Sequence, residues 1–300
     1  MRVVLALGGN ALLRRGEPLD VEVQRRNVAV AARAVAEVAR RHTVVLTHGN
    51  GPQVGLLALQ AEAYRAVAAY PLDVLGAESE GMIGYLLAQE LRNELPQREV
   101  AVLLTQVLVG RADPAFAHPD KPIGPVYGDA EARALGARPG LAIARDGAGW
   151  RRVVPSPLPR GILELETIRR LVADGVLVVC GGGGGIPVAR APNGRLEGVE
   201  AVIDKDRFAA RLASELDADV LALLTDVDAI YRDWPECSRP LRRVVPAEVR
   251  ALALVPGSMA PKAAAACDFV DAGGGRAAIG ALQDALALVE GERGTQIAAG

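Results

Sequence analysis

The stretch from Val176 to Asp206, VLVVCGGGGGIPVARAPNGRLEGVEAVIDKD, decides the expected fold. Its first residues, Val176 to Val179, form a continuous aliphatic run, which is typical of a strand buried on both faces of a parallel sheet. Five glycines, Gly181 to Gly185, then remove every Cβ at the end of that strand, so backbone N–H groups can turn toward an anion. A flexible linker is the alternative, but such linkers lie between polar segments rather than after a hydrophobic strand. The stretch therefore predicts a buried strand followed by an anion-binding turn.

The composition describes an ordinary globular chain of 300 residues with 50% hydrophobic content and a net charge of -2. This charge supplies no basic field for nucleic acid, so we expect no nucleic-acid partner. No apolar run approaches the roughly 20 residues needed to span a bilayer, and the apolar amino terminus is short and broken by glycine, unlike a signal peptide. We therefore expect a cytoplasmic protein without a membrane partner. Its three cysteines lack metal-type spacing, and we assign no metal site to side chains.

Two further strand-and-glycine units precede this stretch. Arg2 to Leu7 is a β-branched and aliphatic run that ends in Gly8-Gly9-Asn10, and Thr43 to Leu46 is followed by Gly49-Asn50-Gly51. Between them, Val21 to Arg41 carries apolar residues at helical spacing. A strand, a helix and a strand in this order form a βαβ unit, whose ligand crevice lies at the carboxyl ends of the strands. The chain is therefore predicted to have an α/β fold.

The rest of the chain continues this pattern with one interruption. Between Gly110 and Arg160, prolines break every long period, which leaves room for short pieces such as a hairpin of Leu141 to Arg145 and Trp150 to Val154. We interpret this region as a small excursion from the main sheet. The other expected helices are Val54 to Tyr64, Ser79 to Asn93, Glu164 to Asp174, Asp206 to Leu216, Met259 to Cys267 and Ala277 to Glu290, and the other expected strands are Val100 to Leu104, Val220 to Leu224 and Phe269 to Ala272.

Lysine is rare in this chain. Lysine and arginine sum to 34, yet only Lys121, Lys205 and Lys262 are lysines. A compact ammonium group suits a moving phosphoryl group better than the bulkier, more directional guanidinium. Each lysine lies beside glycine, proline or aspartate, in a loop or at a helix start, and we select all three as candidates for chemistry. A solvated loop lysine remains the alternative for Lys121, and a tolerated surface lysine the alternative for Lys262.

The three glycine turns can converge on one edge of a parallel sheet. There they would offer N–H donors to phosphate oxygens, while Lys205 and Lys262 add positive charge, and phosphoryl transfer needs mainly such positioning and electrostatic stabilisation. The strand Val220 to Leu224 ends in Thr225, Asp226 and Asp228, whose carboxylates suit a metal or a ribose hydroxyl, or simply cap the next turn. A P-loop is excluded, because no lysine is followed by serine or threonine.

Twelve segments in order resemble the carbamate kinases, a branch of the amino acid kinase superfamily. They are ALGGNAL, THGNGPQVG, PLDVLGA, GMIGY, TQVLV, DPAF, KPIGP, VPSPLP, GGGGIPV, GVEAVIDKD, LTDVD and GSMAPK. The resemblance covers nearly the whole chain. It implies a three-layer αβα sandwich around a mainly parallel sheet, with a small protruding subdomain at about residues 110–160. It also implies a single domain over residues 1–300, with the carbamoyl substrate in residues 1–165 and the nucleotide in residues 166–300.

The resemblance also implies a reaction and roles for residues. The reaction is reversible phosphoryl transfer between ATP and carbamate, giving ADP and carbamoyl phosphate, with Mg²⁺ and in a homodimer. Lys205 and Lys262 would bind the transferred phosphoryl group, Asp206 would orient these lysines, and Lys121 would reach in from the excursion. The carbamoyl phosphate end would be held by Gly8, Gly9, Asn10, Gly49, Asn50 and Gly51. We assign the nucleotide to Gly182, Gly183, Gly184, Thr225, Asp226 and Asp228.

Two departures from the family pattern stand out. In Glu78-Ser79-Glu80 the resemblance leads us to expect an uncharged residue and a glutamine around the serine, and Gly110 stands where an acidic residue is usual. Related kinases of amino acid carboxylates commonly carry a lysine before the first glycine pair, whereas this chain has Ala6-Leu7 there. Such a kinase, and a catalytically silent nucleotide-binding protein of the same fold, are the alternative functions.

Overall fold

The computed structural model describes residues 1–14, 16–64, 66, 68–138, 140–147, 149–252, 254 and 259–300. Its helices are α1 (Gly9–Leu12), α2 (Val21–Ala39), α3 (Gly51–Ala63), α4 (Leu72–Glu94), α5 (Asp129–Gly136), α6 (Leu165–Ala173), α7 (Lys205–Glu215), α8 (Pro246–Arg250), α9 (Met259–Asp271) and α10 (Ala285–Val289). Its strands are β1 (Arg2–Leu7), β2 (Thr43–His48), β3 (Val100–Leu103), β4 (Gln106–Leu108), β5 (Lys121–Tyr127), β6 (Ala142–Asp146), β7 (Gly149–Val154), β8 (Gly161–Ile162), β9 (Leu177–Cys180), β10 (Ile186–Arg190), β11 (Leu196–Gly198), β12 (Val220–Thr225), β13 (Arg243–Val244), β14 (Arg276–Ala281) and β15 (Thr295–Ile297).

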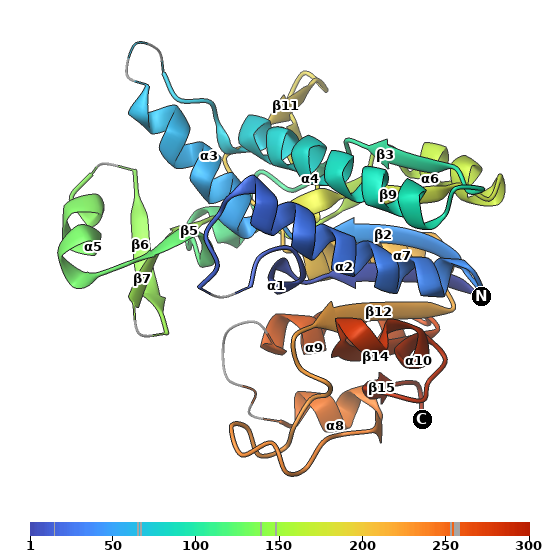
Figure 1. The fold of residues 1–300 in the computed structure, drawn as a ribbon. Helices are drawn as coiled ribbons and strands as arrows, with labels where there is room; N and C mark the ends of the chain where they lie inside the picture. Colours follow the sequence, from blue (N-terminus) through green and yellow to red (C-terminus); the bar gives the residue numbers. More distant parts are fainter. Residues whose placement is uncertain are drawn as a thin grey trace.

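An eight-stranded sheet forms the centre of the molecule, in the order β13-β15-β14-β12-β1-β2-β9-β3 (Figure 1). Every neighbouring pair is parallel except β14 and β15. The inner strands are aliphatic throughout because both faces are covered: β1 is buried from Val3 to Leu7. Strand β9, from the glycine-rich stretch, lies between β2 and β3. The expected mainly parallel sheet is therefore confirmed.

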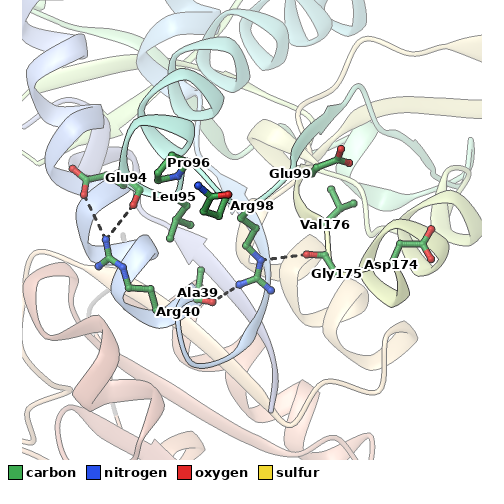
Figure 2. A pocket seen from close by; sticks show the side chains of 11 residues that line it. Ala39, Arg40, Glu94, Leu95, Pro96, Arg98, Glu99, Asp174, Gly175 and Val176 are labelled. Atoms are coloured by element: carbon green, nitrogen blue, oxygen red, sulfur yellow. Dashed lines mark hydrogen bonds and ion pairs between the residues drawn. The ribbon is translucent and has the colours of Figure 1, made fainter.

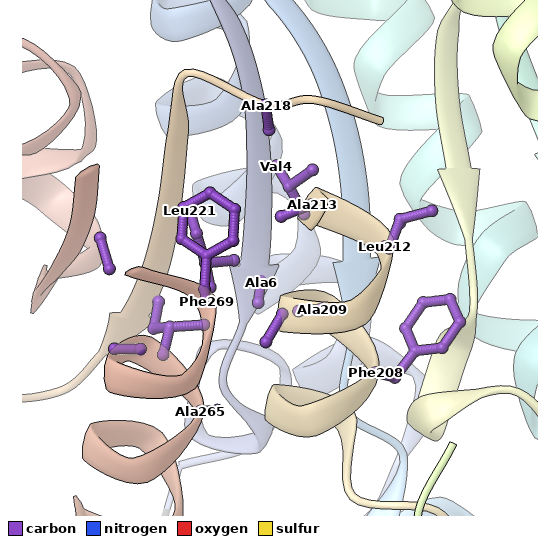
Figure 3. Close-up of a cluster of buried hydrophobic side chains, with 14 of the residues drawn as sticks. Val4, Ala6, Phe208, Ala209, Leu212, Ala213, Ala218, Leu221, Ala265 and Phe269 are labelled. Carbon is purple, nitrogen blue, oxygen red and sulfur yellow. The ribbon is translucent and has the colours of Figure 1, made fainter. Parts of the chain in front are cut away.

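Helices cover both faces of this sheet. Alternate strand residues, such as Val3 and Leu5 of β1, pack with α2, α4 and α10, whereas Val4 and Ala6 pack with α6, α7 and α9. Figure 3 shows the second face, where the rings of Phe208 and Phe269 lie among alanines of α7 and α9. The small alanine side chains let the two helices approach each other and the sheet closely. These layers confirm the αβα sandwich.

A small subdomain protrudes from the sandwich (Figure 1). The three-stranded sheet β5-β7-β6 and the helix α5 form it, and β6 pairs with β7 as the predicted antiparallel hairpin, although Ala148 of its turn lies outside the described residues. The subdomain touches helix α3 of the sandwich backbone to backbone. A Cβ on Gly55 would lie 2.0 Å from the Cα of Gly124, so Gly55 leaves no room for a larger residue, while the φ of +72° at Gly124 favours glycine there.

One prediction near the end of the chain was wrong. Phe269 to Ala272 is not a strand: Phe269 belongs to α9, and the strand is β14, which overlaps the start of the predicted helix Ala277 to Glu290, so only α10 of that helix remains. Helix α9 continues beyond Cys267 because it is rich in alanine and buries Phe269, and it gives way to a turn at Gly273, whose φ is +81°. The alanines of β14 favour a helix locally, but pairing with β12 and β15 determines their structure. Within the described residues, no helix is long and apolar enough to cross a membrane.

Candidate active site

Four adjacent parallel strands end at the same edge of the sheet. Their order is β12-β1-β2-β9, and they are followed by Asp226, Gly8, Gly49 and Gly181. The carboxyl ends of parallel strands are where open α/β sheets bind ligands. The structure therefore brings the predicted turns together at one edge.

Close backbone approaches explain the glycines of the first two turns. A Cβ on Gly8 would lie 2.9 Å from the carbonyl oxygen of Leu224. A Cβ on Gly49 would lie 3.2 Å from the backbone nitrogen of Gly9 and 3.4 Å from Cδ of Lys205. The ends of β1 and β2 thus contact each other, and the stem of Lys205 packs against them. Gly49 is therefore adjacent to both Gly9 and a predicted catalytic lysine, whereas Gly8 lies against the end of β12.

Two lysines meet at one carboxylate in this site. Lys205 and Asp206 begin helix α7, and Lys262 lies in the first turns of α9, which packs against α7. The ammonium of Lys205 pairs with Oδ1 of Asp206, and Nζ of Lys262 lies 3.1 Å from Oδ2. All three residues are less than 10% exposed. Asp206 thus pairs with both ammonium groups, and its role in orienting them for catalysis stays a prediction.

Burial and charge have opposite effects on the pKa values of this cluster. Burial lowers the pKa of Lys205 to about 8, against the attraction of Asp206 and together with the repulsion of Lys262. Burial alone would also lower the pKa of Lys262, but the charge of Asp206 outweighs it and raises that pKa. For Asp206, burial would raise the pKa, yet the two ammonium groups lower it. The cluster has two positive charges against one carboxylate and can therefore attract an anion.

Lys121 also reaches this region, through a residue that sequence reasoning missed. It begins β5 of the protruding subdomain, and its ammonium pairs with Oδ2 of Asp204. Asp204 also caps helix α7, because its Oδ1 accepts from the backbone nitrogens of Asp206 at 2.9 Å and Arg207 at 3.2 Å. Burial would raise the pKa of Asp204, but Lys121 lowers it far below its ordinary value. Lys121 is thus bound at the helix that carries Lys205 rather than solvated in a free loop.

A residue of helix α4 holds the side chain of Asn50 in place. Its Nδ2 donates to Oγ of Ser79 at 2.8 Å, and that hydroxyl donates to the carbonyl of Gly76. Gly51 begins helix α3 directly after Asn50. The side chain of Asn10 lies outside the described part of the chain, although its backbone belongs to α1. Ser79 follows no motif that names its role, so sequence reasoning did not select it.

The glycine turn after β9 differs from the predicted anion cradle. The N–H of Gly181 donates to Oγ1 of Thr105, and that of Gly182 donates to Oε1 of Glu80. The N–H groups of Gly184 and Gly185 donate within the turn, to Gly181 and Gly182. The expectation that these N–H groups are available for phosphate is therefore wrong for these four glycines. The lack of side chains from Gly181 to Gly184 instead allows close packing against Phe208, His48, Asn50 and Ile203, in that order.

The residues after β12 lie at the same edge, beside Gly8. Oγ1 of Thr225 donates to Oδ1 of Asp226 at 3.1 Å. Asp228 accepts from the hydroxyl of Tyr231 at 2.6 Å and lies 3.6 Å from the guanidinium of Arg242. Asp228 thus stabilises its own turn, which agrees with the capping alternative, while its role toward a nucleotide stays a prediction.

A cavity of about 560 Å³ lies elsewhere, at the amino ends of the strands. Figure 2 shows Arg98 reaching across it toward the carbonyl groups of Ala39 and Gly175, and Arg40 contacting Glu94. Glu99 and Val176 of its lining directly precede β3 and β9. The cavity is therefore at the opposite end of the sheet from Lys205 and Lys262, and its arginines already bind protein carbonyls.

Comparison with known proteins agrees with this geometry. Residues 1–280 match the amino acid kinase family. A carbamate kinase of Rhizobium meliloti (strain 1021) is 53% identical over 302 residues, covering 99% of this chain and 93% of that protein. The chain belongs to the carbamate kinases of the amino acid kinase family. This membership confirms the resemblance carried by the twelve sequence segments.

Solved carbamate kinases share the whole architecture. The enzyme of Giardia lamblia bound to citric acid has a TM-score of 0.94 and 41% identity, and covers 99% of this chain and 98% of its own. The same enzyme bound to AMP-PNP has a TM-score of 0.88, with the same identity and coverage. A carbamate kinase of this fold thus binds an ATP analogue.

Proposed function

We propose that this carbamate kinase catalyses reversible phosphoryl transfer between ATP and carbamate, giving ADP and carbamoyl phosphate. The observation that carries the proposal is the buried cluster of Lys205, Asp206 and Lys262 at the carboxyl edge of a family-typical sheet. Phosphoryl transfer spreads negative charge over the equatorial oxygens of the moving group, and preorganised cations stabilise that charge. The cluster supplies such cations away from bulk water.

The reaction requires little proton chemistry from the protein. An oxygen of the carbamate carboxylate attacks the γ-phosphorus, the bond to the β–γ bridging oxygen breaks, and ADP leaves with the electron pair. Because the nucleophile is already an anion, no general base is needed. Lys205 and Lys262 stabilise the charge of the moving group, Asp206 holds them in place, and the turns at Gly8, Gly9, Asn10, Gly49, Asn50 and Gly51 position the carbamoyl end.

We propose that the nucleotide binds toward the carboxy-terminal half, as ATP or ADP with Mg²⁺. The candidate nucleotide residues are Thr225, Asp226 and Asp228, at and after the end of β12, together with Gly182, Gly183 and Gly184, which follow β9. No group of three or more metal-ligating side chains occurs among the described residues. A bound Mg²⁺ would be held mainly by phosphate oxygens of the nucleotide and by water, as is usual for this ion, and would neutralise charge on the phosphates.

A coupled assay tests this function. We expect ATP to form from ADP and carbamoyl phosphate, and we expect no comparable phosphorylation of acetylglutamate or aspartate in parallel reactions. Activity only on the amino acids would favour the alternative kinases of the superfamily. Binding of nucleotide without turnover on any acceptor would favour the silent nucleotide-binding protein.

We also propose that the enzyme is cytoplasmic.

Lys121→Ala should weaken catalysis less than loss of the cluster lysines. Lys121 is partly exposed and pairs with Asp204 rather than with Asp206, so water and metal can replace part of its charge. We expect a loss of about 10-fold to 100-fold in kcat/KM for carbamoyl phosphate, within the range for one electrostatic contact. Arg145→Ala, in the same subdomain, is the control. An unchanged rate at limiting carbamoyl phosphate would show that Lys121 only pairs with Asp204 and has no role toward the substrate.

We also propose a homodimer formed through the outer face of α4. Val74, Met82 and Tyr85 are exposed there at helical spacing, and Leu104 is exposed close to Gly81 of the same helix. Adjacent exposed apolar side chains are typical of interaction surfaces. We expect a solution mass of twice 31.3 kDa, and the mass of one chain for the Met82→Glu, Tyr85→Glu double variant. Val21→Glu on α2 should remain dimeric, and a monomeric unaltered protein would contradict the proposal.

A further inference from the structure

Glu80 is a buried carboxyl group directly beneath the candidate site. It lies on α4 and is 1% exposed. Its Oε1 accepts from the N–H of Gly182 at 2.8 Å, and its Oε2 accepts from the N–H of Thr105 at 3.3 Å. Among the described residues no basic side chain forms an ion pair with it. Burying an ionised carboxylate without a cation strongly raises the free energy of the folded state, whereas burying the neutral acid raises it much less.

The hydroxyl of Thr105 indicates where the proton lies. This hydroxyl donates to the carbonyl of Leu103 and accepts from the N–H of Gly181, both at 2.9 Å. The Glu80 side chain also contacts this hydroxyl, and this contact, like the N–H groups of Gly182 and Thr105, acts to lower the pKa of Glu80 against the larger effect of burial. In this structure the single hydrogen of the hydroxyl goes to Leu103, so the hydroxyl offers Glu80 a lone pair, to which a neutral Glu80 can donate.

The neighbouring titratable groups also favour the neutral acid. The charge of Glu164, beside α6, repels a negative charge on Glu80. Cys180 of β9 lies close by, and burial raises the pKa of its thiol above the ordinary range. His48 of β2 also packs against Gly182, and burial lowers its pKa to about 4, so it carries no compensating positive charge. Together, burial and Glu164 raise the pKa of Glu80 to about 8.

Glu80 and its neighbour Ser79 hold two touching parts of the site. Ser79 accepts from Nδ2 of Asn50, and Glu80 accepts from Gly182. A Cβ on Gly183 would lie 2.2 Å from that Asn50 nitrogen, so the glycine turn is packed directly against the Asn50 amide. A displacement of the turn therefore displaces Asn50.

We propose that Glu80 is a positioning residue which, as an uncharged carboxylic acid, holds the glycine turn against Asn50 and so sets the carbamoyl end of the site. This inference rests on the proposed function. Ionisation of Glu80 places a negative charge beneath the site, loses the hydrogen bond to Thr105 and repels an anionic substrate. The KM for carbamoyl phosphate then rises in alkaline solution, and kcat is less affected. Loss of the proton from Lys205 acts instead on kcat, which separates the two groups.

Glu80→Gln tests the proposal, because the amide imitates the neutral acid. Its carbonyl keeps the hydrogen bond from Gly182, and its NH₂ group can donate to the hydroxyl of Thr105, while the longer 3.3 Å bond from the N–H of Thr105 is lost. We expect kcat and KM near pH 7 to stay within about twofold of the unaltered enzyme. Between about pH 7 and pH 9 we expect the KM for carbamoyl phosphate to rise by about threefold or more in the unaltered enzyme and to stay flat in the variant. A strong loss of activity in the variant near pH 7, or an identical rise in KM, would overturn the proposal.

Glu164→Gln is the matched control. It removes one carboxylate from the neighbouring segment, where Glu164 accepts from Gln106 rather than from the glycine turn. We expect this variant to keep the alkaline rise in KM and to show it at lower pH, because the charge of Glu164 raises the pKa of Glu80. If the rise in KM moved to higher pH instead, the charge of Glu164 would not be what raises the pKa of Glu80.

Thermal unfolding gives a readout that needs no activity. The pKa of Glu80 is about 8 in the folded protein and near its ordinary 4.5 when unfolded. Between these values only the unfolded chain loses the proton, so stability relative to Glu80→Gln falls as the pH rises. We expect the Tm of the variant minus that of the unaltered protein to grow up to about pH 8 and then level off. A Tm difference that does not change with pH would contradict the proposal that Glu80 is uncharged, even if the protein had no kinase activity.

Discussion

Replacing Lys205 with alanine is expected to lower kcat by about 10³-fold, and replacing Lys262 should have an effect of similar size, because each variant removes one of the two cations proposed to face the moving phosphoryl group. Both ammonium groups are buried and paired with Asp206, so water cannot easily replace either of them. The measurement is the rate of ATP formation from ADP and carbamoyl phosphate at saturating substrates.

The folded state should survive both changes. In each variant the other lysine still pairs with Asp206, so no buried carboxylate is left alone. Circular dichroism and Tm, measured beside the rates, check this expectation. Arg207→Ala removes an exposed cation from the same helix as Lys205 and should keep the normal rate. Near-normal turnover in either lysine variant would contradict the proposed mechanism.

Asp206→Asn should cost both activity and stability. It leaves two buried ammonium groups without their carboxylate, and breaking a buried pair in this way costs about 3–5 kcal/mol. Without Asp206, the pKa of Lys205 should fall below its present value of about 8, because the carboxylate opposes the effect of burial. We expect kcat to fall by about 10²-fold or more.

The pH profile distinguishes this variant from a merely destabilised protein. Lys205 is active as the ammonium ion, so a lower pKa moves the alkaline loss of kcat to lower pH. Asp268→Asn removes an exposed carboxylate from the same helix as Lys262 and should leave the pH of the alkaline loss of kcat unchanged. An alkaline limb unchanged in Asp206→Asn would show that Asp206 does not set the charge of Lys205.

The sequence predicts the sheet and the lysines well for physical reasons. Uninterrupted aliphatic runs such as Arg2 to Leu7 are strands because both faces of a parallel sheet are covered. Lys205 and Lys262 stand out because arginine fills nearly all other basic positions. The sequence does not reveal that Asp204 binds Lys121, because that pair joins segments 83 residues apart.

Hydrogen-bond partners are the least predictable part. Five consecutive glycines suggest free N–H donors, yet Gly181 and Gly182 donate to Thr105 and Glu80, which come from other elements. The same limit applies to β14, whose alanines favour a helix until β12 and β15 are placed beside them. Local pattern identifies the elements, whereas the contacts between distant segments determine what each polar group binds.

The position of β9 between β2 and β3 determines when the sheet can form while the chain is being synthesised on the ribosome. Strand β3 has its partner only after residue 180 has been synthesised, and β1 is paired on both sides only after residue 225. Until then the emerging amino-terminal half exposes unpaired strand edges, which are prone to aggregate. The two predicted substrate halves, 1–165 and 166–300, therefore share one sheet that neither can complete. A nascent chain of this kinase must be kept from association until most of it has emerged.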